Sequence, residues 1–145
     1  MPGTPLQSYG KTSYILIQGE DCYCASQAER RWLEHINPML LAGEITKLIW
    51  QPEGSKLAYK YGGHDCADVY RPDARVTWRD GPAWTIEVKN QALHQKSASK
   101  MKRFAQQFPD EKLVLVWFGR IPTKGVAHRR LVHLEPWLDH IWRMK

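Results

Sequence analysis

Two short stretches decide the fold of this chain, Tyr70-Arg71-Pro72-Asp73-Ala74-Arg75-Val76 and Ile86-Glu87-Val88-Lys89-Asn90. A Pro-Asp pair is followed, after a short gap, by Glu-x-Lys within an apolar run. Converging carboxylates suit a hard divalent cation such as Mg²⁺, which prefers oxygen ligands. A lysine beside them can position a water and offset charge in a transition state. These residue types favour metal-assisted hydrolysis of a phosphodiester bond.

Alternation along the second stretch predicts which side chains lie together. Successive side chains of a β-strand point to opposite faces of the sheet. Ile86 and Val88 are then expected on a core face, and Thr85, Glu87 and Lys89 on the other. The acid and the lysine of the pattern therefore share a face.

The connection between the two stretches predicts a β-hairpin. Residues 80–82 read Asp-Gly-Pro, which is a turn signal. A three-residue loop there pairs Arg75 with Glu87 and Asp73 with Lys89, so that Asp73 and Glu87 become diagonal neighbours within reach of one metal. A two-residue loop would take Asp73 off the shared face, so we predict an odd loop or a bulge.

Composition describes a basic globular chain. It has 145 residues, of which 43% are hydrophobic and 25% charged, and we expect a single domain spanning residues 1–145. The net charge of +6 and the pI near 9.3 favour a polyanionic partner such as nucleic acid. No apolar stretch approaches the length of a membrane span, and residues 1–12 lack the apolar segment of a signal peptide. A cytoplasmic protein without membrane contact is expected.

Cysteine usage gives no disulfide framework, because the count of three is odd. Cys22, Cys24, Cys66 and His64 offer four zinc ligands in number, but their spacing does not match a common zinc module. We expect free thiols.

Periodicity and breakers predict an alternating order of strands and helices. The expected strands cover residues 13–18, 45–51, 56–61, the two hairpin stretches, 112–118 and 125–134, and the expected helices cover 26–42, 93–108 and 136–144. Residues after Gly62-Gly63 are expected to form a loop. The run 112–118 is too continuously apolar for an edge strand, so we place it centrally, with a parallel neighbour.

The first helix has clear start and stop signals. Ser26 is a plausible N-cap, and Glu29 three residues later completes a capping-box pattern. Gly43 is a plausible C-terminal stop. Asn37-Pro38 interrupts the pattern, and Pro38 is suited to open a second short helix.

The order helix, strand, hairpin, helix, strand over residues 26–118 resembles the αβββαβ core of the PD-(D/E)xK nuclease superfamily. The expected fold is thus a mixed α/β (α+β) restriction-endonuclease-like core with an extra N-terminal strand and a C-terminal helix. The resemblance implies that Asp73 and Glu87 bind Mg²⁺ or Mn²⁺, assisted by the main-chain carbonyl of Val88. It also implies that Lys89 is the catalytic lysine.

The resemblance extends to shorter motifs. Many superfamily members carry a glutamate in a Ser-x-x-Glu pattern of the first helix, which makes Glu29 a fourth candidate catalytic residue; a purely capping role is the alternative. Ala42-Gly43-Glu44-Ile45 and Tyr70-Arg71-Pro72-Asp73 are similar to segments of phage nuclease-like proteins and of phage Holliday-junction resolvases of the T7 endonuclease I type. Ala74 and Asn90 depart from the residues usual in the family.

Basic residues near the two stretches are candidates for binding a phosphate backbone. The set is Arg75, Lys96, Lys100, Lys102 and Arg103. Ion pairing and simple solvation are the alternatives for each of them.

The expected activity is a Mg²⁺-dependent endonuclease that cuts DNA, selective for structure because the chain has little room for a sequence-reading domain. The resemblance implies a homodimer, and the shortness of the chain also favours recruitment by a protein partner for targeting. The alternatives are an end-cutting nuclease subunit of a transposition or recombination complex, and a nuclease-fold module that binds DNA without cutting it. A basic assembly protein with structural carboxylates is a further alternative.

Overall fold

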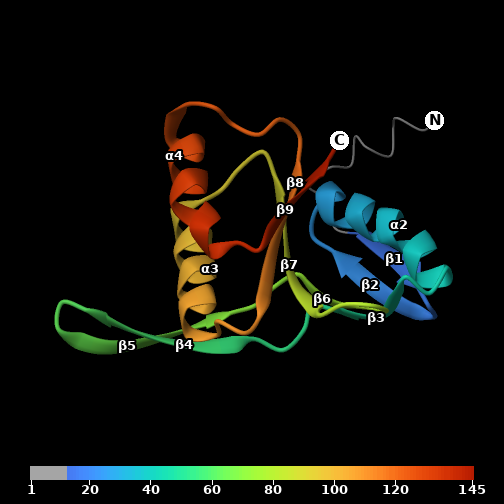
Figure 1. Cartoon of the computed structure of the whole chain (residues 1–145), viewed down its shortest axis with the longest axis horizontal. Helices are drawn as coiled ribbons and strands as arrows, with labels where there is room; N and C mark the ends of the chain where they lie inside the picture. The colour runs from blue at the N-terminus through green and yellow to red at the C-terminus, as the bar shows by residue number, and fades with distance from the viewer. Residues whose placement is uncertain (1–12) are drawn as a thin grey trace.

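A mixed five-stranded sheet forms the centre of the molecule in a computed structural model that describes residues 13–145 (Figure 1). Helix α2 (Gln27–Leu41) covers one face, and α3 (Gln95–Gln107) and α4 (Gly125–Leu134) cover the other. The strands run in the order β3 (Ile45–Trp50), β6 (Ala74–Trp78), β7 (Ala83–Asn90), β8 (Lys112–Phe118) and β9 (His140–Met144). The coarse prediction of a mixed α/β fold is confirmed.

Strand β8 has the central, parallel position predicted for it. It pairs in parallel with β7 on one side and β9 on the other, whereas β3, β6 and β7 pair antiparallel. Every side chain from Leu113 to Phe118 is buried. Helices on both faces bury both sides of the strand, which explains its continuous apolar sequence.

Helix α2 begins and ends where the sequence indicates. Ser26 Oγ accepts a hydrogen bond from Glu29 N at 3.2 Å. At the other end, Gly43 has a φ of +79°, and the N–H groups of Gly43 and Glu44 donate to the carbonyls of Leu40 and Met39. This pair of hydrogen bonds is a Schellman motif, which satisfies the last carbonyls of the helix.

The predicted break at Pro38 is wrong, because Pro38 lies inside a continuous α2. Ile36 and Leu40 flank it and are both buried against the sheet. Their packing holds the helix together across the missing amide hydrogen bond.

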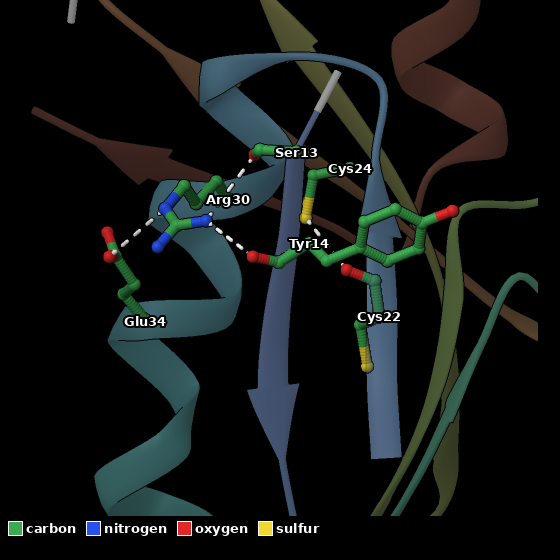
Figure 2. Close-up of polar contacts among 6 residues, drawn as sticks. All are labelled: Ser13, Tyr14, Cys22, Cys24, Arg30 and Glu34. Carbon is green, nitrogen blue, oxygen red and sulfur yellow. Dashed lines mark hydrogen bonds and ion pairs between the residues drawn. The ribbon is translucent and has the colours of Figure 1, made fainter. Parts of the chain in front are cut away.

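A small hairpin, β1 (Ser13–Ile17) with β2 (Glu20–Cys24), lies beside α2. The sequence pattern predicts the first of these strands but not the second. Figure 2 shows Arg30 of α2 between the two elements: its Nη1 donates to the Tyr14 carbonyl at 2.8 Å, and its Nε lies 3.5 Å from Glu34 Oε2. Cys22 and Cys24 are buried, and all three cysteines are free, as expected.

A second hairpin replaces the loop predicted after Gly62-Gly63. Strand β4 (Ser55–Tyr61) pairs along its whole length with β5 (His64–Tyr70), and the pair extends away from the body in Figure 1. Helix α3 holds it: Arg103 stacks 3.9 Å over the Tyr59 ring, and the Gln107 amide donates to and accepts from the backbone of Ala58.

The C-terminal predictions are wrong in both places. The strand expected over residues 125–134 is helix α4, and the helix expected over 136–144 is a 3-10 turn, η1 (Glu135–Trp137), followed by β9. Leu131 and Leu134, spaced as on a helix, are buried in the core that α3 and α4 form with the sheet. Asp139 anchors the start of β9, because its carboxylate accepts from Leu113 N at 2.7 Å. After β8 the core is therefore extended by a helix and then a strand, α4 and β9, in place of the predicted strand and then helix.

Gly43→Ala is expected to destabilise the protein by about 1 kcal/mol, because an L-residue is strained in the left-handed region even with open space around its Cβ. Chemical denaturation measures the difference. Gly81→Ala is the control, because its φ is not positive and its new Cβ would meet Trp78 at an ordinary 3.7 Å. Equal stability of the two variants would contradict the role given to Gly43.

Candidate functional site

The predicted acid and lysine lie on the sheet face covered by α3. Glu87 and Lys89 of β7 contact residues of that layer, whereas Ile86 and Val88 belong to the core beneath α2. The predicted division of β7 into two faces is therefore confirmed.

The hairpin register differs from the predicted one by two residues. Arg75 pairs with Thr85, and Thr77 with Ala83, so five residues, 78–82, connect the last pair. The odd loop is confirmed and the pairings of Arg75 with Glu87 and of Asp73 with Lys89 are wrong. The longer connection arises because Trp78 pairs with Ile45 of β3 and packs its ring edge-on against Trp84. Continuing this register brings Asp73 opposite Glu87, closer than the predicted diagonal.

Asp73 is hydrogen-bonded to β7 through the backbone of Val88, whose carbonyl is the third predicted metal ligand. Its Oδ2 accepts a hydrogen bond from Val88 N at 2.7 Å, and its own N–H donates to the Ile86 carbonyl at 3.0 Å. The N–H and C=O of one strand residue point to the same side of the strand. The main-chain carbonyl of Val88 thus lies on the Asp73 side, beyond the last β6–β7 pair at Ala74.

Glu87 is almost completely buried, with 7% of its surface exposed. Tyr70, at the end of β5, donates its hydroxyl to Glu87 Oε1 at 2.7 Å. Lys89 Nζ lies 3.5 Å from Glu87 Oε2 and donates to Ser97 Oγ of α3 at 3.2 Å. Both carboxylate oxygens of Glu87 therefore face a polar group.

Burial disfavours charge on both acids, and the nearby Glu87 charge disfavours it further on Asp73. The pKa of Asp73 rises to about 8, first because the carboxyl is buried and second because the Glu87 charge is close. Burial also raises the pKa of Glu87, against the opposing influence of the Lys89 ammonium and the Tyr70 hydrogen bond. Two adjacent carboxylates cannot easily ionise together without a cation.

Glu29 extends this group from the first turn of α2. Its Oε1 accepts a hydrogen bond from Ala25 N at 3.0 Å, so it does cap the start of the helix. Burial and the nearby Asp73 charge raise its pKa to about 7, while the Ala25 hydrogen bond and Lys89 oppose the rise. The capping and site interpretations of Glu29 are therefore compatible.

A cavity of about 240 Å³ opens beside Glu87. Its wall combines Tyr70 at the end of β5 and the following Arg71 with Ser97 and Lys100 of α3. Lys100 Nζ lies 3.4 Å from Asp68 Oδ1 and donates to the Val69 carbonyl. The acid therefore borders open space that also contains cationic groups.

The other predicted nucleic-acid-binding residues are dispersed. Arg75 forms an ion pair with Glu111, and Arg103 stacks on Tyr59. Lys96 is exposed, and Lys102 lies on the side of α3 that faces α4, with Nζ 6.0 Å from the Trp137 ring centre. Of the five, Lys100 alone lines the cavity beside Glu87.

Three polar residues near the acids carry no role in the sequence prediction. Tyr70 stands in the Tyr-x-Pro-Asp motif, but the pattern does not say that its hydroxyl turns toward Glu87. Ser97 and Thr85 have no sequence signal. Thr85 is buried on the same face, and its hydroxyl has no hydrogen-bond partner among the described residues.

Across residues 13–145, no group of three or more His, Cys, Asp or Glu side chains converges closely enough to hold a metal ion. The acidic centre is a pair, Asp73 with Glu87, and Glu29 lies further out. In the same range no helix is long and apolar enough to cross a membrane. The chain matches no protein-family model, no curated protein and no solved structure.

In EDTA, stability is expected to fall as the pH rises from about 4, near the unfolded pKa of an aspartate, to about 8, its folded pKa. The folded state holds the Asp73 proton more tightly than the unfolded state, so the penalty is complete only above the folded pKa. Asp73→Asn removes this penalty on the charged carboxylate. At pH 8 the free energy of unfolding of the variant should exceed that of the parent by more than about 1.4 kcal/mol, the value of one pKa unit.

Urea denaturation at both ends of this pH range measures the difference. Asp110→Asn is the control, because Asp110 is exposed in the turn between α3 and β8. If the difference in stability between Asp73→Asn and the parent protein does not change with pH, the folded state does not raise the pKa of Asp73.

Proposed function

We propose that this protein is a metal-dependent nuclease that hydrolyses phosphodiester bonds of DNA. One observation carries the proposal: the Asp73 and Glu87 carboxyls are adjacent and shielded, and Lys89 lies 3.5 Å from one of them. Such an arrangement costs folding free energy unless a cation or a substrate uses it. A purely structural role would be served better by apolar side chains of similar size.

The donor set fits a hard divalent cation such as Mg²⁺ or Mn²⁺. Asp73 and Glu87 offer carboxylate oxygens, and the Val88 carbonyl lies on the same side of β7. A divalent charge between the two acids would offset their burial and the repulsion from Glu87 that helps to raise the pKa of Asp73. We therefore assign Asp73, Glu87 and the main-chain carbonyl of Val88 as the residues that would hold it.

The proposed chemistry divides among the surrounding side chains. The bound cation supplies charge neutralisation and lowers the pKa of a water. Lys89, held between Glu87 and Ser97, orients the attacking water and faces the developing charge. Glu29, whose pKa is near neutral, accepts a proton at its carboxylate. Tyr70 fixes Glu87 by its hydrogen bond.

The chain order of the elements supports the PD-(D/E)xK assignment. The sequence α2, β3, β6, β7, α3, β8 follows the αβββαβ pattern once the β4–β5 hairpin is taken as an insertion. The acid pair also lies where this pattern carries its active site, at the start of β6 and on β7. We further propose that the substrate is a branched DNA such as a four-way junction, cut by a homodimer.

Lys89→Ala is expected to reduce DNA cleavage by about 100-fold or more, the usual effect of removing one transition-state contact. The measurement uses labelled four-way junction, forked, duplex and single-stranded DNA, each with Mg²⁺, Mn²⁺ or EDTA. Lys47→Ala is the matched control, because Lys47 is an exposed lysine of β3.

Metal-dependent cutting that Lys89→Ala loses and Lys47→Ala keeps would support the nuclease. Cutting that survives Lys89→Ala would overturn the assignment of the lysine. Salt-sensitive binding of the same DNA without any cutting would favour the non-cleaving DNA-binding module.

Mg²⁺ or Mn²⁺ is expected to raise the free energy of unfolding by about 2.7 kcal/mol when its free concentration is 100 times its Kd. Asp73→Asn should abolish this gain, because it removes one of the two charged ligands. Thermal melting with increasing metal at pH 8 tests it, and Asp110→Asn should retain the full gain. An identical response of all three proteins would place the metal elsewhere.

A further inference from the structure

A second and larger cavity lies between α3 and α4, on the opposite side of α3 from Glu87. Its volume is about 470 Å³. The polar part of its lining consists of Gln95, Ser99 and Lys102 from α3 and Arg129, Arg130 and His133 from α4. Ala98 and Leu134 are buried beneath it.

The lining of this cavity is basic. It contains no acidic side chain. Within residues 13–145, none of its four basic side chains takes part in an ion pair: the ion pairs of α3 and of the neighbouring strands involve other residues. Cations gathered without a counter-charge repel one another, and an anion relieves that repulsion.

One of the basic groups, Arg130, is held in place by the backbone. Arg130 Nη1 donates to the Leu93 carbonyl at 3.0 Å, which fixes the guanidinium and leaves its other N–H groups. Lys102 Nζ lies 6.0 Å from the centre of the Trp137 ring. Arg129 and His133 are exposed and stand four residues apart on α4, so they follow one face of that helix. A row of donors is therefore presented along the cavity.

Helix α3 separates this basic cavity from the acid pair. On one side of the helix, Ser97 accepts the hydrogen bond of Lys89, and Lys100 lines the cavity beside Glu87. Ser99 and Lys102 turn to the other side. An α-helix with its side chains is about 10–12 Å across, and base pairs rise about 3.4 Å each. The two sides of α3 are thus about three nucleotides apart along a duplex.

We propose that the cavity between α3 and α4 binds backbone phosphates of a nucleic-acid strand, about three nucleotides from the bond held at Glu87 and Lys89. This inference rests on the proposed nuclease function for its choice of polyanion. A strand fits better than a small anion, because the basic groups come from two helices and follow an open cavity rather than enclosing one point. Binding here would position the strand and would leave the chemistry to the acid pair.

DNA binding measured by fluorescence anisotropy in EDTA, over a series of salt concentrations, tests the proposal without cleavage. Arg129→Ala and Lys102→Ala should each weaken binding about threefold or more and reduce the slope of log K against log salt by about one. Lys47→Ala removes an exposed lysine outside both cavities and should change neither. Thermal melting should find all three variants folded, since the substituted side chains are exposed.

Unchanged affinity and slope in both cavity variants would overturn the inference. The inference would also be overturned if Arg129→Ala weakened the binding of inorganic pyrophosphate but left DNA binding intact. That result would describe a site for a small anion. The two proposals fail separately. Weakened DNA binding in the cavity variants of a protein that never cuts would reject the nuclease only, whereas metal-dependent cutting with normal DNA affinity in those variants would reject the basic cavity only.

Discussion

The close approach of two buried carboxyl groups is the constraint on which the rest of this structure depends. Asp73 and Glu87 come from neighbouring strands and are shielded from water, and burial raises the pKa of each. Three polar groups contact the acids: the Val88 N–H donates to Asp73, and Tyr70 and Lys89 lie against Glu87. The sheet places the acids together, and the surrounding elements make their proximity tolerable.

Helix α3 links the two parts of the structure to which we assign functions. One side of it supplies Ser97 and Lys100 to the acid pair and holds the β4–β5 hairpin through Arg103 and Gln107. The other side forms a wall of the basic cavity through Lys102. The basic residues of one short helix therefore lie in three different places: beside Glu87, against the β4–β5 hairpin and in the basic cavity. Their spacing along the helix does not predict this distribution.

Prediction from sequence worked where local chemistry decides the outcome. Ser26 and Gly43 mark the ends of α2, the apolar run of β8 requires burial on both sides, and alternation in β7 separates Glu87 from Val88. It failed where a distant partner decides. Residues 140–144 become a strand because β8 offers an edge to pair with. The β6–β7 register depends on Trp78 meeting β3 and Trp84, and the pairing of Lys100 depends on Asp68, which the β4–β5 hairpin brings against α3.

The length of the β4–β5 hairpin does not affect the contact that its base makes with the site. Its base ends in Tyr70, which holds Glu87, whereas its tip at Gly62 and Gly63 is exposed and has open space around both glycines. Residues added at the tip would extend the hairpin outward without moving the tyrosine. The tip is therefore a place where the sequence can drift during evolution, and where a fluorophore or an affinity tag can be inserted at little cost to the site.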